Sequence, residues 1–214
     1  MGVEIVWLEW QRDAPKWRQV TYETASRNGE PFAELMATRS YLPNPVARFC
    51  TAELKIRAMQ GYMGDHGFKG WVNVVGIRAD EPMRVARMRK PNKNDRWENA
   101  VPLADAGVAK ADVSRWWADR NFGLNLPNIK GTTPMGNCDL CFLKGASTIS
   151  GIMAMRPELA DWWIDQEAVP RGNGRGAFFR SDRPSYATML DAVERQEAFD
   201  FGDTDALGDC FCTD

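Results

Sequence analysis

The fold is decided by the stretch WVNVVGI at residues 71–77, which carries the clearest strand signal in the chain. A short apolar run rich in β-branched residues is typical of a strand inside a buried sheet. Residues 3–10 (VEIVWLEW) are rich in residues that favour strands and predict another strand, and residues 97–103 are expected to be extended. Helices are predicted at about 31–39, from 51 to 61 or 64, and at 110–120, 146–154, 157–168 and 184–197. Strands that alternate with helices favour an α/β architecture with a largely parallel sheet.

This pattern divides the chain into two regions. Residues 1–145 are expected to form the α/β domain, and residues 146–214 are expected to form a helical C-terminal region that ends in a cysteine-bearing tail. Residues 121–137 are rich in glycine, asparagine and proline, and they predict a long loop.

The composition excludes several classes of protein. Among 214 residues, 27 are basic and 29 are acidic, so the formal net charge is −2. A dedicated nucleic-acid binder would be strongly basic, although a local basic patch remains compatible with this balance. A zinc site of the HExxH type needs two histidines, and the chain has one. No stretch approaches the roughly 20 apolar residues of a membrane helix, and a signal peptide is not predicted, so we expect a cytoplasmic protein with no membrane partner.

The five cysteines predict a metal centre rather than disulfide bonds, because their number is odd and the expected compartment is reducing. Cys138 and Cys141 form a CxxC, and Cys50 lies at the predicted start of a helix, where a thiolate is stabilised. With Cys210 or Cys212 as a fourth ligand, these thiols suit either structural zinc or an iron–sulfur cluster. The alternatives are buried, inert cysteines and a thioredoxin-type dithiol, which the long loop before the CxxC disfavours.

Three motifs in this order resemble the phosphoadenosine phosphosulfate reductase family, and more closely its phage and bacterial branch. They are RFCTAELK at residues 48–55, GIRADE at 76–81 followed by Arg84 and Arg87, and GNCDLCF at 136–142. The family belongs to the adenine-nucleotide α-hydrolase superfamily, so the resemblance implies a Rossmann-like parallel sheet. It also implies a substrate of the adenylyl-sulfate type and a thiol electron donor.

The resemblance further implies a [4Fe–4S] cluster, with zinc as the alternative. Family members bind the cluster through a Cys-Cys pair and a later CxxC. Here the pair is reduced to Cys50 and Thr51, and Cys210 or Cys212 is the candidate for the missing ligand. A C-terminal cysteine of the reductases attacks the sulfate sulfur, so Cys210 is assigned as the metal ligand and Cys212 as the catalytic nucleophile, although the two roles can be exchanged.

The anion-binding residues follow from the same motifs. Gly76 would let the backbone approach a ligand closely, and the planar fork of Arg78 suits phosphate or sulfate oxygens. Arg84 and Arg87 add positive charge, and the first motif contributes Arg48 and Lys55. The alternative is a solvated basic helix face, but the position after the predicted strand favours an anion site.

One departure from the superfamily concerns the start of the chain. No Ser-Gly-Gly loop for nucleotide phosphates occurs in the 214 residues, so the fold is expected to be N-terminally shortened. Trp7 or Trp10 would then face solvent, and the chain would be poorly stable or self-associate as a homo-oligomer.

Three functions remain open at this stage. The first is a sulfonucleotide-reductase-like enzyme, and the second is an enzyme of the same superfamily that modifies nucleic acid with sulfur. The third is a non-catalytic binding module stabilised by zinc or a cluster.

Overall fold

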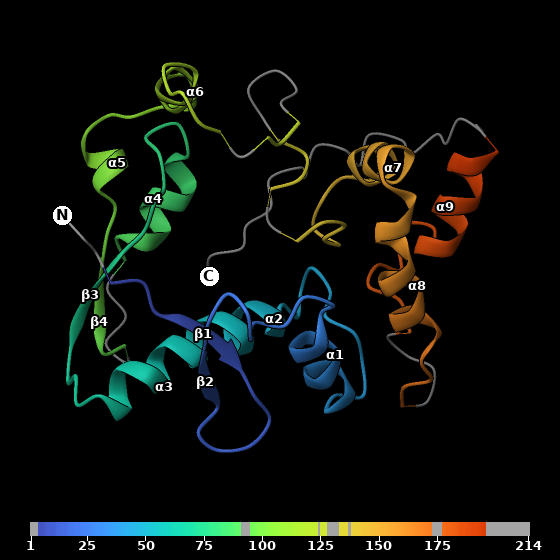
Figure 1. Cartoon of the computed structure of the whole chain (residues 1–214), viewed down its shortest axis with the longest axis horizontal. Coiled ribbons are helices and arrows are strands. Elements are labelled where there is room, and N and C mark those ends of the chain that lie inside the picture. Colours follow the sequence, from blue (N-terminus) through green and yellow to red (C-terminus); the bar gives the residue numbers. More distant parts are fainter. Residues whose placement is uncertain are drawn as a thin grey trace. The chain divides into compact units, whose positions relative to one another are not determined.

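A computed structural model of the chain describes residues 4–90, 95–123, 125–127, 133–136, 138–172 and 177–195 (Figure 1). It is a mixed α/β fold with short sheets and several helices. The contacts divide the chain into two compact units: a first unit of Met1–Met63 with Met135–Asp214, and a second unit of Gly64–Pro134. This division differs from the predicted boundary at residue 145, because the segment that precedes the C-terminal helices packs with them.

The first unit begins with a hairpin. β1 (Trp7–Trp10) and β2 (Trp17–Val20) pair antiparallel, with Trp10 opposite Trp17. The prediction of a strand near the start is therefore correct, but its partner is the next segment of the chain. Trp7 is 41% exposed whereas Trp10 is 5% exposed, so the expected exposure holds for Trp7 alone.

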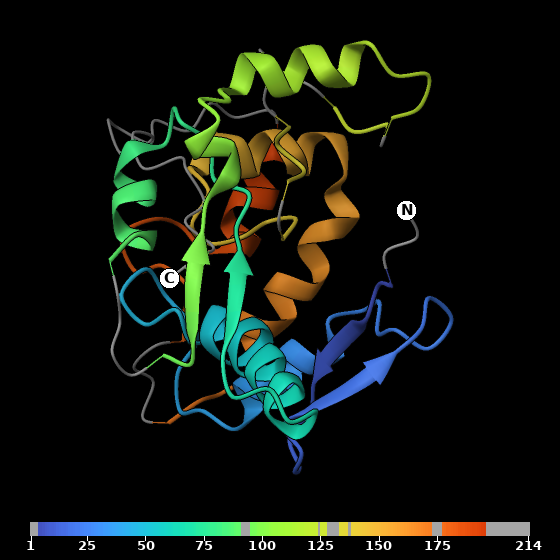
Figure 2. The ribbon, with the colours of Figure 1, turned by 90° about the vertical axis from the view of Figure 1, so that its left-hand side faces the viewer.

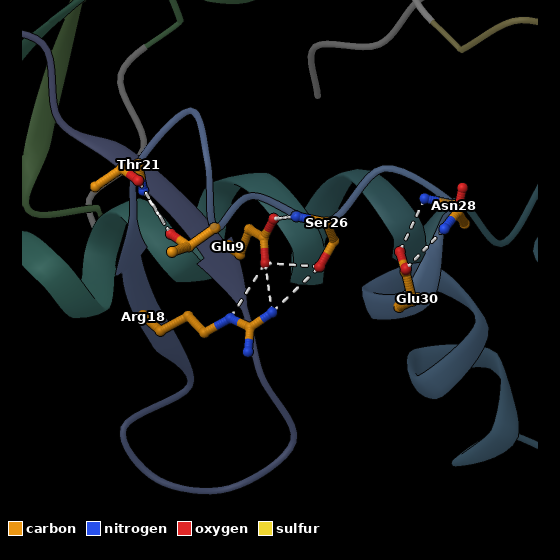
Figure 3. A network of polar contacts seen from close by, with 7 residues as sticks. Glu9, Arg18, Thr21, Ser26, Asn28 and Glu30 are labelled. Atoms are coloured by element: carbon orange, nitrogen blue, oxygen red, sulfur yellow. Dashed lines mark hydrogen bonds and ion pairs between the residues drawn. The ribbon is translucent and has the colours of Figure 1, made fainter.

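A carboxylate fixes the chain that leaves this hairpin. Figure 3 shows Arg18 and Ser26 pointing toward Glu9. Arg18 Nη2 and the Ser26 hydroxyl donate to Glu9 Oε2 at 2.7 and 3.0 Å, and the Ser26 backbone N–H donates to Oε1 at 2.5 Å. Burial acts to raise the pKa of Glu9, but the hydrogen bonds from Arg18 and Ser26 outweigh it and the pKa is lowered. Glu9 therefore joins both strands to the segment before the first helix.

Two helical segments follow in the first unit. α1 (Glu30–Ala37) confirms the predicted helix, and Pro31 lies in its first turn. Gly29 precedes α1 with a φ of 77°, and a Cβ there would lie 2.8 Å from the Trp162 indole, so both the backbone conformation and the space favour glycine. The second predicted helix is also confirmed and is continuous over α2 (Phe49–Thr51), the π-helical η1 (Ala52–Arg57) and α3 (Ala58–Asp65), which reaches into the second unit.

The C-terminal helices carry the largest hydrophobic cluster. They are α7 (Ala146–Met155), the 3₁₀ turn η2 (Pro157–Leu159), α8 (Ala160–Ala168) and α9 (Tyr186–Glu194). Met36 and Leu42 from the N-terminal part, and Leu140 and Phe142 from the CxxC loop, are buried in the same cluster. The predicted helices at 146–154, 157–168 and 184–197 are confirmed within the described residues, where they form the main core instead of an appendage to a sheet.

The second unit contains a parallel strand pair. β3 (Trp71–Val74) and β4 (Trp97–Ala100) run side by side in the same direction (Figure 2). α4 (Pro82–Met88) follows β3, and α5 (Pro102–Asp105) and α6 (Lys110–Ala118) follow β4. A small cluster of Ile77, Val85 and Val101 joins the strand ends to α4.

The prediction that β3 is buried on both faces is wrong. Val72 and Val74 are 61% and 67% exposed, whereas Trp71 and Asn73 on the alternate face are partly buried. That partly buried face lies toward α4, since Asn99 donates to the Met88 carbonyl at 3.4 Å. Apolar composition alone therefore predicted the strand but not its environment.

No helix among the described residues is both long and apolar enough to cross a membrane.

Candidate functional site

The CxxC lies on a tight loop directly before α7. Cys141 N–H donates to the Cys138 carbonyl at 3.4 Å, and Lys144 N–H donates to the Cys141 carbonyl at 2.9 Å. The two turns give the thiols different environments, since Cys138 is exposed and Cys141 is buried. Cys138 is accordingly the more accessible thiol of the pair.

Basic and phenolic side chains tie this loop to the rest of the first unit. Each of them donates to a backbone carbonyl of the loop: Lys144 Nζ to Asp139 at 2.7 Å, Tyr186 Oη to Leu140 at 2.5 Å, Arg183 Nη1 to Lys144 at 2.9 Å and Arg180 Nη1 to Phe142 at 3.5 Å. Arg180 and Arg183 come from the segment before α9, and Tyr186 is the first residue of α9, so long-range contacts hold the CxxC loop.

Cationic and anionic side chains both lie near this loop, since Arg180 pairs with Asp182, and Asp182 and Glu167 act electrostatically on Arg183. Lys144 is 6% exposed, and burial lowers the pKa of Arg183 while leaving the guanidinium charged. Burial also raises the pKa of Tyr186, which therefore stays a neutral donor to Leu140. The loop therefore presents an exposed thiol at Cys138 on a backbone that these hydrogen bonds fix.

Glu167 on α8 holds the start of α9 against this loop. Its two carboxylate oxygens accept the backbone N–H groups of Phe179 at 3.2 Å and Tyr186 at 3.0 Å. Burial raises the pKa of Glu167, and the two hydrogen bonds only partly offset that rise.

The raised pKa of Glu167 predicts a pH-dependent stability. Protonation of Glu167 is more favourable in the folded state, so its contribution is fully present below the unfolded carboxyl pKa of about 4.3 and is lost as pH rises through the folded value. We therefore expect the difference in unfolding free energy between wild type and Glu167→Gln to be larger at pH 4 than at pH 7, measured by urea denaturation. Glu158→Gln should show the opposite trend, because the hydrogen bond from Arg156 lowers the pKa of Glu158. Equal differences at both pH values for Glu167→Gln would contradict the assignment.

The described cysteines do not form a metal-binding group by themselves. Within the described residues, no three or more His, Cys, Asp and Glu side chains come close enough to hold a metal ion. Cys50 is partly buried at the start of α2 and packs against the same hydrophobic cluster as the CxxC loop. Cys210 and Cys212 lie outside the described residues, so the cluster and zinc stay predictions.

The remaining predicted residues of the first unit lie close to Cys50 along the chain. Arg48 immediately precedes α2 and is partly exposed, and Lys55 is exposed on η1. A π-helical segment is uncommon and frequently marks a functional site, which makes the helix after Cys50 a feature of interest.

The GIRADE loop connects β3 to α4 in the second unit. Arg78 Nε donates to Asp80 Oδ1 at 2.9 Å, and Arg78 Nη1 lies 3.5 Å from Glu81 Oε2. Glu81 also pairs with Arg84, and Arg87 lies on the same short helix. The Lys110 N–H donates to Asp80 at 3.0 Å, and together with Arg78 it lowers the pKa of Asp80. Glu81 thus brings Arg78 and Arg84 together, and acidic neighbours pair with both guanidinium groups.

Sequence reasoning missed the residues that support the CxxC loop. Lys144, Arg180, Arg183 and Glu167 have no motif of their own, and only the closeness of Lys144 to Cys141 offered a signal.

Comparison with known proteins finds a phage relative for part of the chain. The chain is similar to the uncharacterized nin region protein ORF290 of Escherichia phage lambda, with 31% identity over 134 residues, which is 62% of the chain. The match covers 41% of that phage protein, so the chain spans less than half of its length. No protein-family model matches the chain. No solved structure matches it.

Proposed function

We propose that the chain is a phosphoadenosine phosphosulfate reductase-like protein that acts on an adenylyl-sulfate-type nucleotide and has a Rossmann-like fold. The observation that carries the proposal is the GIRADE loop at the carboxyl end of β3, beside the parallel strand β4. Open parallel sheets bind ligands at the carboxyl ends of their strands. Arg78 there offers a planar fork for phosphate or sulfate, which would replace Asp80 as its partner.

The CxxC loop gives separate support for sulfur chemistry. An exposed thiol at Cys138 and a buried one at Cys141 lie on a loop that basic side chains surround. In the proposal, Cys212 takes the nucleophilic role that the family resemblance implies. Cys50, Cys138, Cys141 and Cys210 are the thiolates that would hold a [4Fe–4S] cluster or zinc, and anaerobic iron, sulfide and zinc analysis distinguishes these two.

Gly76 offers a sharp test of the nucleotide site. A Cβ on Gly76 would meet only Leu103 Cδ1 at 4.0 Å, so Gly76→Ala should leave the stability of the protein unchanged. If a ligand approaches the backbone there, the added methyl group should weaken the binding of adenosine 3′,5′-bisphosphate, measured by calorimetry. A matched control is Gly123→Ala, since nothing lies within 4 Å of a Cβ at that position.

Arg78→Lys should weaken the same nucleotide about tenfold, because an ammonium group cannot reproduce the two parallel hydrogen bonds of a guanidinium. Arg115→Lys on α6 is a suitable control, since that side chain is 71% exposed and pairs with Asp112. Unchanged affinity in both Arg78→Lys and Gly76→Ala would contradict a nucleotide site at the GIRADE loop.

A further inference from the structure

A groove of about 970 Å³ lies in the second unit, at the end of the strands opposite the GIRADE loop. Its walls come from the residues that precede and begin β3, from the end of α4 and from the start of β4. The residues that matter to the argument are Lys69, Trp71, Arg89, Lys90, Arg96 and Trp97.

Two partly buried indole rings stack on each other in the wall of this groove. Trp71 and Trp97 are register partners at the start of β3 and β4, and their ring centroids are 5.5 Å apart with an interplanar angle of 20°. Asn73 donates to Asn99 at 3.1 Å, and Asn99 donates to the Met88 carbonyl at 3.4 Å. These hydrogen bonds hold both strands and the end of α4 together, so the rings stand on a fixed base.

Basic side chains line the same groove as the rings. Lys69, Lys90 and Arg96 are exposed, and Arg89 pairs with Asp105 at a position where both side chains are 57% exposed. Such an exposed ion pair contributes little free energy, so Arg89 can exchange Asp105 for another anion. Two acidic residues, Asp95 and Glu98, also line the groove, so basic side chains outnumber acidic ones.

We infer that this groove binds single-stranded nucleic acid, with bases stacking on Trp71 and Trp97 and the basic residues contacting the phosphates. Aromatic platforms within a basic groove are the recurrent solution for binding unpaired strands. The volume is at the upper end of small-molecule pockets, and the cations come from three separate segments, which suits several phosphates better than one. A duplex keeps its base faces stacked on each other and offers no such surface to an indole.

The electrostatic half of the inference is tested with fluorescently labelled 15-mers of deoxythymidine and of uridine, followed by anisotropy. We expect Lys90→Glu with Arg96→Glu to weaken binding at least tenfold and to reduce the slope of log affinity against log salt by about 0.7 for each phosphate that is no longer neutralised. Lys16→Glu in the first unit is the matched control, because Lys16 is exposed and lies outside the groove. Binding of either sugar type supports the inference, and an unchanged affinity in the double variant overturns it.

The stacking half is tested with Trp97→Leu and Trp97→Phe, whose folding is checked by circular dichroism. Loss of one stacked base should weaken binding about tenfold in Trp97→Leu, whereas Trp97→Phe keeps a ring and should retain most of the affinity. Equal affinity in both variants, or duplex binding as tight as single-strand binding, would overturn the inference. Gly76→Ala and Arg78→Lys should leave oligonucleotide binding unchanged, which separates this groove from the proposed nucleotide site.

Discussion

Trp163→Ala is expected to lower the free energy of unfolding by about 4 kcal/mol, because it removes a large side chain from the main core. Trp163 is 5% exposed on α8. Its ring lies 4.9 Å from Phe179 and 5.2 Å from Tyr186, centroid to centroid, and neither neighbour can fill the space left behind without moving. In a chain of this length, such a loss lowers the melting temperature by roughly 10 °C.

Trp116→Ala is the matched control for this prediction. Trp116 is 48% exposed on α6, where it contacts Trp117 and the Arg120 guanidinium. We expect that substitution to change the unfolding free energy by about 1 kcal/mol or less. Similar losses for the two variants in urea denaturation would show that the C-terminal helices do not form the main core.

Arg183→Met should destabilise the protein by about 2 kcal/mol, because it removes two hydrogen bonds that a partly buried guanidinium donates. The hydrogen bonds removed are those to the Lys144 carbonyl at 2.9 Å and to Tyr186 Oη at 3.2 Å. The substitution also removes the positive charge that partly offsets the burial-driven rise in the pKa of Glu167.

The same variant should change the reactivity of the CxxC loop. With fewer donors holding the loop, Cys141 should be alkylated by iodoacetamide faster than in wild type, as followed by peptide mass spectrometry. Cys138 is already exposed, so its rate should change little. Arg195→Met provides the control, since Arg195 is 61% exposed and pairs with Asp191 one helical turn away. An Arg183→Met protein with wild-type stability and slow Cys141 labelling would contradict the support role of Arg183.

Local signals in the sequence predicted the helices better than their packing. The prolines at positions 31 and 157 and the apolar periodicity marked α1, α7 and α8 near their observed bounds. β2 escaped prediction because its four residues, WRQV, have no apolar run, and its pairing depends on the register with β1. The exposure of Val72 and Val74 likewise depends on what covers the sheet, which a strand's own residues do not encode.

The residues of the candidate site likewise form two groups: those that local motifs predicted and those that only tertiary packing brings to the site. Motif spacing singled out Cys138, Cys141 and Arg78, because a CxxC and a glycine-containing loop at the end of a strand are recognised from a few neighbouring residues. Arg183 and Glu167 reach the CxxC loop only through tertiary packing, 39 positions from Lys144 in the case of Arg183. Sequence patterns also missed that Arg78 is engaged by Asp80, since two adjacent charges predict a solvated surface as readily as an ion pair.

The measurement that tests the central claim most directly is anaerobic release of sulfite from phosphoadenosine phosphosulfate in the presence of a dithiol. A thiolate of the protein would attack the sulfate sulfur, break its bond to the phosphate oxygen and release adenosine 3′,5′-bisphosphate. The dithiol would then reduce the resulting S-sulfocysteine, giving sulfite, a free cysteine and an oxidised dithiol. We predict sulfite formation by the wild-type chain that Cys212→Ser abolishes. Sulfite at the level of the dithiol alone, from a folded chain with its metal content restored, would contradict the proposed function.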